Sequence, residues 1–240
     1  MRSYKLKWFT MSNDFFQFKQ FIVRQDLCAM KVGTDGTLLG AWARGGERIL
    51  DIGTGTGLIA LMMAQRFEKA IVDAIDIDEG ACAQAQRNAA ESPFGDRINI
   101  CNKSLQEFSE QETAKRYDSI VSNPPYFVHS LKAPDERRSM ARHAETLSYY
   151  DLMKCSANML SENGEISLVI PFDCRKHLEE AAILSGLFSS RICAVKTKPE
   201  KAPKRYLLAF TKRPATVVQE ELVIGSDKYV EMMKDFYLKL

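Results

Sequence analysis

The stretch R-I-L-D-I-G-T-G-T-G, residues 48–57, decides which fold this 240-residue chain can adopt. Residues 48–52 have the aliphatic composition and length of a buried strand, and the glycines that follow permit a tight turn. Residues 57–66 then have the spacing of a helix. A strand, a glycine-rich turn and a helix in this order place free backbone N–H groups at a sheet edge, where a ligand can approach the main chain.

The alternation of short apolar runs and amphipathic runs continues beyond this stretch, and such alternation is typical of an α/β sheet. Strands are expected at residues 48–52, 70–76, 97–101, 117–122, 165–170, 188–196 and 206–211. Helices are expected at residues 57–66, 79–91, 104–114, 147–160 and 174–184. The sequence therefore predicts an α/β fold with a sheet of seven strands.

The two ends of the chain fall outside this alternation. Residues 14–25 alternate aromatic and polar side chains like a hairpin, and residues 37–43 have the composition of a short helix. The segment 124–144 is charged and lacks periodicity, so we expect a long loop there. The predicted parts are an N-terminal extension at 1–45, a core at 46–213 and a C-terminal strand and helix at 214–240.

Composition narrows the class of protein. With 45% hydrophobic and 27% charged residues the chain has the make-up of a globular domain, and its net charge is only +2. Residues 191–213 nevertheless contain eight lysines and arginines against one acidic residue, Glu200. No run approaches the length of a membrane span, and the six cysteines form no C-x-x-C pair and read as reduced thiols. We therefore expect a cytoplasmic protein.

A second polar signal follows the strand at 70–76. Asp76 ends this strand, where α/β nucleotide sites commonly place a carboxylate on ribose hydroxyls, and Ile77 beside it could cover one face of an adenine. The glycine turn does not match the dinucleotide fingerprint G-x-G-x-x-G, because Leu58 stands where the third glycine is required. A nucleoside-bearing cofactor other than NAD or FAD is therefore favoured.

A third signal is Y-D-S-I-V-S-N-P-P-Y, residues 117–126. Because two prolines hold the chain extended after the strand, the Asn123 side chain and the Pro124 carbonyl can point the same way as two acceptors. A flat group that carries an NH₂ would satisfy both acceptors, and Tyr126 could stack on its face. These features predict catalytic roles for Asn123, Pro124 and Tyr126.

The glycine turn, the acidic strand end and N-P-P-Y together resemble the class I S-adenosylmethionine-dependent methyltransferases that act on planar amino groups. The resemblance implies a Rossmann-like, mostly parallel sheet with helices on both faces. It implies that Asp51 binds the amino group of the cofactor and Asp76 its ribose. The other cofactor-binding residues implied are Gly53, Gly55, Gly57, Asp35 and Ile77, with Ser104 or Leu105 near the adenine amine.

The flanking segments resemble one family more specifically. F-Q-F-K-Q-F (16–21), C-A-M-K-V-G-T-D-G-T-L-L-G-A-W-A (28–43) and K-R-Y-L-L-A-F (204–210) are similar to the bacterial tRNA(Val) adenine-N6-methyltransferase family. That resemblance implies methylation of the N6 amine of adenine at nucleotide 37, next to the anticodon. Two alternatives stay open, a methyltransferase acting on ribosomal RNA or a protein glutamine, and a non-catalytic module that binds S-adenosylmethionine and RNA.

Substrate contacts are expected from residues around the N-P-P-Y segment and from the basic stretch. The candidates are Pro125, Phe127, Lys132, Arg138, Lys201 and Lys204. The chemistry needs no metal, since two acceptors and proximity are sufficient to activate the amine. We expect tRNA as the partner, no membrane and a monomer.

Overall fold

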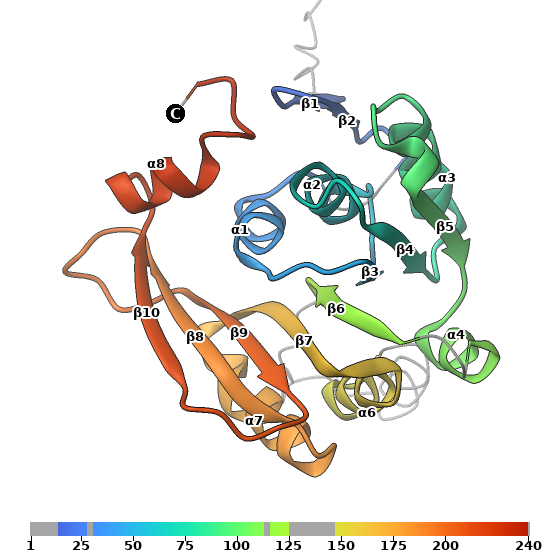
Figure 1. The fold of residues 1–240 in the computed structure, drawn as a ribbon. Coiled ribbons are helices and arrows are strands. Elements are labelled where there is room, and N and C mark those ends of the chain that lie inside the picture. Colours follow the sequence, from blue (N-terminus) through green and yellow to red (C-terminus); the bar gives the residue numbers. More distant parts are fainter. Residues whose placement is uncertain (1–13, 28–30, 113–115, 125–146, 240) are drawn as a thin grey trace, which may run out of the picture.

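The computed structural model describes residues 14–27, 31–112, 116–124 and 147–239. Its centre is an eight-stranded sheet in the order β10-β8-β9-β7-β6-β3-β4-β5 (Figure 1). The strands are β3 (Arg48–Ile52), β4 (Ile71–Asp76), β5 (Ile98–Asn102), β6 (Tyr117–Ser122), β7 (Leu160–Pro171), β8 (Phe188–Lys196), β9 (Arg205–Thr211) and β10 (Val218–Val223).

The sheet is mostly parallel. Strand β9 is antiparallel to both β7 and β8, and the other neighbours in the sheet pair in parallel. The α/β prediction is confirmed, but the described part of the sheet has eight strands rather than seven, because β10 pairs in parallel with β8. Strand β7 also starts earlier than expected, at Leu160, and its register with β6 is irregular between Tyr117 and Ser119.

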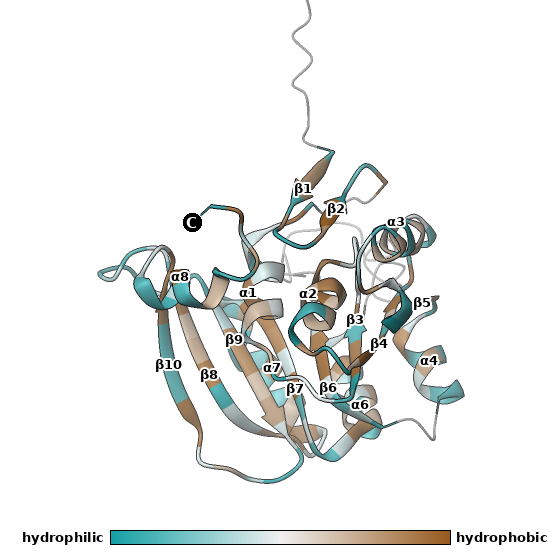
Figure 2. Ribbon diagram, turned by 45° about the horizontal axis from the view of Figure 1, so that its top comes forward, coloured by the Kyte–Doolittle hydropathy of each residue, from teal (hydrophilic) through white to brown (hydrophobic). Residues whose placement is uncertain are grey.

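Helices cover both faces of the sheet (Figure 1). They are α1 (Thr34–Trp42), α2 (Leu58–Arg66), α3 (Glu79–Ala90), α4 (Leu105–Gln111), α6 (Tyr149–Met159), α7 (Arg175–Leu184) and α8 (Asp227–Met233). Two hydrophobic clusters form the core, one that includes α1 and α2 and one that includes α6 and α7. Figure 2 shows hydrophobic residues concentrated along the inner strands. The result is a three-layer arrangement with the sheet in the middle.

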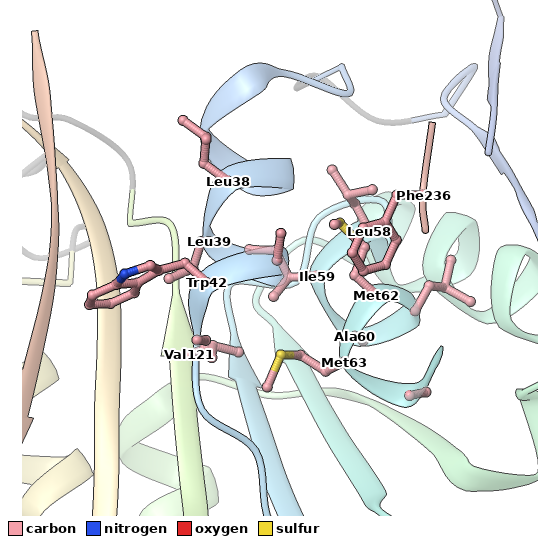
Figure 3. Close-up of a cluster of buried hydrophobic side chains, with 14 of the residues drawn as sticks. Leu38, Leu39, Trp42, Leu58, Ile59, Ala60, Met62, Met63, Val121 and Phe236 are labelled. Carbon is pink, nitrogen blue, oxygen red and sulfur yellow. The ribbon is translucent and has the colours of Figure 1, made fainter. Parts of the chain in front are cut away.

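Helices α1 and α2 pack closely on each other. Figure 3 shows Leu39 of α1 and Ile59 and Met63 of α2 gathered in one cluster with Val121 of the sheet. A Cβ at Gly40 would lie 2.8 Å from the sulfur of Met62, so only glycine permits this approach. The packing fixes the start of α1 next to the start of α2, where the glycine turn lies.

The N-terminal hairpin forms a separate two-stranded sheet, β1 (Phe15–Gln17) with β2 (Ile22–Arg24). Asn88 of α3 accepts a hydrogen bond from the Arg24 amide and donates one to the Arg24 carbonyl, each 2.9 Å long. The Phe18 ring stacks on Tyr237 near the C-terminus. These contacts join the hairpin to the core. None of the helices in the described ranges has the length and apolar character needed to span a bilayer.

Candidate active site

The turn after β3 is built on three left-handed glycines. Gly53, Gly55 and Gly57 have φ angles of 70°, 56° and 81°, which side chains other than glycine rarely adopt. The amides of Gly53 and Thr54 both donate to the Ile75 carbonyl at the end of β4, at 2.9 and 3.0 Å. The glycines thus form the tight turn that the sequence predicted, and these two hydrogen bonds also fix it against the neighbouring strand.

A pocket of about 360 Å³ opens beside this turn. Residues 31–36, the turn residues 53–56, the start of α2, Asn123 and Arg205 line it. Pockets for small ligands typically start at about 300 Å³, so the volume suits a cofactor-sized molecule. The sheet thus brings the glycine turn and the asparagine of N-P-P-Y to one pocket at the carboxyl edge.

A hydrogen bond aligns Asn123 with the glycine turn. Ser122 ends β6 opposite Ile52 of β3, and the Ser122 hydroxyl donates to the Ile52 carbonyl at 2.8 Å. Gly53 and Asn123 follow directly on neighbouring strands, so they leave the sheet at the same level. Asn123 is half-buried and Pro124 is buried. The described part of the N-P-P-Y segment therefore stands where the sequence predicted.

Asp51 lies under the turn with its side chain fully buried. Its Oδ2 accepts hydrogen bonds from the Thr54 hydroxyl at 2.7 Å and the Ala60 amide at 3.1 Å. Among the described residues its Oδ1 has no hydrogen-bond partner. Burial, only partly offset by these two bonds, raises the pKa of Asp51 to about 7. A buried carboxylate with one oxygen left without a hydrogen bond is an acceptor for a cationic ligand group.

Asp76 ends β4 and contacts the same turn. Its Oδ2 accepts from the Gly55 amide at 2.9 Å, and its Oδ1 accepts from the Asp78 amide at 3.0 Å. Each carboxylate oxygen has a second lone pair, so hydroxyl donors can still bind it. The adjacent Ile77 side chain is 66% exposed, which is high for an aliphatic residue and leaves it open to cover a ligand.

Asp35 and Arg205 form an ion pair on the wall of the pocket. Asp35 lies in the first turn of α1, and Arg205 begins β9, so the pair joins two elements that are far apart in the sequence. Partial burial lowers the pKa of the Arg205 guanidinium, which still carries its charge at neutral pH. Asp35 is not the residue that caps α1, because that position is Gly33.

Ser104 and Leu105 do not line the pocket. Ser104 forms a capping box with Glu107 at the start of α4, and its hydroxyl bonds the Glu107 carboxylate at 2.7 Å. Leu105 is only 3% exposed and belongs to the hydrophobic core. Their assignment to the adenine amine stays a prediction, and the capping role accounts for Ser104 by itself.

The predicted catalytic residue Tyr126 lies outside the described residues, as do four predicted substrate-binding residues, Pro125, Phe127, Lys132 and Arg138. Lys201 and Lys204 are exposed between β8 and β9. Thr54 and Arg205 were missed as individual site residues, although both lie inside segments that the sequence singled out. Within the described ranges no group of three or more histidine, cysteine or acidic side chains could hold a metal ion.

Comparisons with known proteins agree with this geometry. The model of the family described as "Methyltransferase small domain" matches residues 37–199. A relative from Parabacteroides distasonis is 50% identical over 239 residues, with 96% of this chain and 100% of the relative covered. A relative from Trichodesmium erythraeum is 43% identical, with 95% and 100% covered. Both are named tRNA1(Val) (adenine(37)-N6)-methyltransferase.

Solved structures share the fold. A predicted O-methyltransferase from Agrobacterium tumefaciens has a TM-score of 0.61 at 20% identity, with 81% of this chain and 90% of that chain covered. A methyltransferase from Pyrococcus furiosus has a TM-score of 0.51 at 24% identity, with 73% and 80% covered. At these identities the likeness establishes the class I methyltransferase fold, in which the pocket described above lies at the carboxyl edge of the sheet.

Proposed function

Because this chain belongs to the family of tRNA1(Val) (adenine(37)-N6)-methyltransferases, we propose that it methylates N6 of adenine 37 in tRNA1(Val). S-adenosylmethionine is the methyl donor of this methyltransferase family. The observation that carries the proposal is the position of Asn123, which faces the same pocket as the glycine turn. This position supports a cofactor site in the pocket with the Asn123 acceptor beside it.

The glycine turn that lines the pocket suits S-adenosylmethionine, and so do the two carboxylates that hydrogen-bond this turn from outside the pocket lining, Asp51 and Asp76. A Cβ on Gly53 would meet no atom within 4 Å, so its absence leaves open space along the turn for a ligand. The free Oδ1 of Asp51 suits the ammonium of the methionine part, and the Asp76 carboxylate suits ribose hydroxyls. We therefore assign these three residues to the cofactor. Bound S-adenosylmethionine supplies an electrophilic methyl group, which the adenine N6 receives.

Asn123 and Pro124 activate the amine. The lone pair of an adenine N6 is delocalised into the ring, which makes this nitrogen a poor nucleophile. If the Asn123 Oδ1 and the Pro124 carbonyl accept its two hydrogens, they favour a pyramidal nitrogen with its lone pair directed to the cofactor side. These acceptors are held before the reaction begins, and they bind more strongly as positive charge develops on nitrogen. The surplus proton leaves to solvent.

The remaining substrate residues support the RNA assignment by their chemistry. Exposed lysines such as Lys201 and Lys204 suit contacts with phosphates. Tyr126 and Phe127 remain candidates for stacking on the extruded adenine, and Lys132 and Arg138 for the anticodon arm. A cytoplasmic location and a monomeric state also remain predictions. The expected tRNA partner supports the cytoplasmic location.

The test is methylation of defined RNA. The protein is incubated with S-adenosylmethionine and unmodified total tRNA, and the nuclease fragments are identified by mass spectrometry. The expected result is N6-methyladenosine confined to the anticodon-loop fragment of tRNA1(Val). A tRNA1(Val) transcript with guanosine at nucleotide 37 is the matched control and should accept no methyl group.

If tRNA is not methylated, ribosomal RNA and release factors are tested next under the same conditions. Methylation of either would identify a different substrate, and methyl transfer from S-adenosylmethionine would remain the reaction. If no acceptor yields S-adenosylhomocysteine although the cofactor binds, the chain is a binding module and the enzymatic proposal is wrong.

A further inference from the structure

An exposed aromatic side chain stands above the carboxyl edge of the sheet, close to the pocket but not part of it. Phe172 directly follows β7, and 48% of its surface is exposed. Neither the cofactor pocket nor the hydrophobic core uses this ring. A single exposed phenylalanine is ordinary on a protein surface, so a function for this ring depends on what surrounds it and not on its exposure.

The strand register places Phe172 beyond Asn123. Leu168 of β7 pairs with Ser122, the last residue of β6. Asn123 is therefore one residue past this level and Phe172 is four residues past it. At a rise of about 3.3 Å per residue, Phe172 stands roughly 10 Å farther out than Asn123, on the adjacent strand. This offset of the backbone favours a role for the ring beside, rather than on, the base held by Asn123.

The Phe172 ring is held in place on one side. The backbone amide of Phe172 donates a hydrogen bond to the Lys204 carbonyl at 3.1 Å, which joins Phe172 to the connection before β9. Its ring stacks on Tyr206, with centroids 5.8 Å apart and an interplanar angle of 26°. Tyr206 is itself only 9% exposed, and the Arg175 guanidinium lies 4.8 Å from the centroid of its ring. Phe172 is thus a supported aromatic surface rather than a loose side chain.

Two lysines of the connection before β9 lie on the same side as this surface, whereas the adjacent Asp173 is an exposed carboxylate. Lys204, whose main chain bonds Phe172, is exposed, and Lys201 lies on the same connection. Arg175 is partly neutralised by Glu179 at 2.9 Å, so the two lysines are the groups most available to an anionic ligand. A rigid aromatic ring beside lysines is the combination with which proteins bind single-stranded nucleic acid, the ring stacking on a base and the lysines contacting phosphates.

We propose that Phe172 is a stacking platform for an unpaired base of the anticodon loop next to the methylated adenosine, with Lys204 on the adjoining phosphate. This inference rests on the proposed function, because it requires an RNA substrate. When the target adenine leaves the loop stack, its neighbour loses a stacking partner, and the Phe172 ring supplies a replacement. The platform contributes to RNA binding and not to methyl transfer itself.

The first test compares steady-state kinetics of Phe172→Ala with those of the unmodified enzyme on a tRNA1(Val) transcript. The KM for RNA should rise about 5- to 150-fold, corresponding to about 1–3 kcal/mol of stacking. The kcat and the affinity for S-adenosylmethionine should not change. Phe172→Tyr should restore the KM because it keeps the ring.

The matched control is Phe188→Ala. Phe188 is 42% exposed and starts β8, where it pairs with Thr211 at the opposite end of β9 from Arg205. Phe188 has similar exposure but lies at the opposite end of the strands from the pocket, so its removal should leave the KM for RNA unchanged. An equal effect of both substitutions would show a general loss of stability and would overturn the proposal.

The second test reads stacking directly. Anticodon stem-loops carry 2-aminopurine at one of the two nucleotides that flank the target adenosine, in separate RNAs. With saturating protein, one of them should be less fluorescent in the wild-type complex than in the Phe172→Ala complex. If each RNA has the same fluorescence in the wild-type and Phe172→Ala complexes and the KM is unchanged, the stacking platform is overturned. Wild-type methylation would then still support the proposed function. Absence of wild-type methylation would instead overturn the proposed function.

Discussion

Asp76 accepts a hydrogen bond from the backbone amide of Gly55 at 2.9 Å, so the carboxylate at the end of β4 also holds the glycine turn that follows β3. Its second oxygen accepts from the Asp78 amide at 3.0 Å. The same side chain therefore orders the glycine turn and keeps lone pairs for the ribose contact proposed above. A substitution at Asp76 tests two roles, which a pair of variants can separate.

Asp76→Ala should weaken binding of S-adenosylmethionine about 10- to 150-fold, because hydrogen bonds to charged groups are worth about 1.5–3 kcal/mol. Asp76→Asn keeps an oxygen acceptor for the Gly55 amide but loses the charge, so its loss should be smaller. Isothermal titration calorimetry measures both affinities. Unchanged affinity in Asp76→Ala would remove the ribose assignment.

Gly53→Ala should abolish most cofactor binding with only a modest loss of stability. An alanine at φ 70° costs about 1–2 kcal/mol of folding free energy. Its methyl group would also enter the open space beside the turn, where the ligand is proposed to lie.

Gly186 provides the matched control for this substitution. It has a φ of 73°, and a Cβ there also meets no atom within 4 Å, but it does not line the pocket. Denaturant unfolding should give similar stability losses for Gly53→Ala and Gly186→Ala, whereas calorimetry should find a cofactor-binding defect only in the former. Normal binding by Gly53→Ala would place the cofactor elsewhere.

Asp51 should make the stability of the cofactor-free protein depend on pH. Burial raises its pKa from 3.8 to about 7, so between these values the folded state binds more protons than the unfolded state. Stability should therefore fall as the pH rises from about 4 to about 7, by up to about 4 kcal/mol from this group.

Asp51→Asn should remove this contribution. Urea unfolding of the wild type and the variant at pH 5 and pH 7.5 measures it, and the stability difference between the two proteins should change with pH. Equal pH dependence in both proteins would show that Asp51 titrates normally. Cofactor affinity of the wild type should rise between pH 5 and 7 as the carboxylate ionises, and the variant should lack this rise.

Asn123→Ala should lower kcat about 100-fold or more, the size of effect seen when one preorganised group that stabilises developing charge is removed. Affinity for S-adenosylmethionine should remain within severalfold of the wild type, since the assigned cofactor contacts come from the turn and from Asp51 and Asp76. Single-turnover methylation with saturating RNA measures the chemical step. Full turnover by this variant would contradict the acceptor-pair mechanism.

The local sequence predicted most elements, because periodicity and turn residues act over short distances. The glycines at 53, 55 and 57 predicted a tight turn after the first strand of the alternation, and in the structure all three have positive φ. The boundary between α6 and β7 was wrong by several residues: Leu160 was expected to end a helix but begins the strand. Local propensity did not reveal that Leu160 pairs with Tyr117 across the sheet.

The sequence by itself determined the α/β class and the glycine turn after β3, and it predicted the acceptor pair after β6, since each depends on neighbours within a few residues. Only the tertiary structure decided which distant side chains meet. It paired Asp35 with Arg205 on the pocket wall, left one oxygen of Asp51 unsatisfied, and stacked Phe172 on Tyr206. Such contacts depend on strand order and register, which long-range packing fixes and which no local pattern encodes.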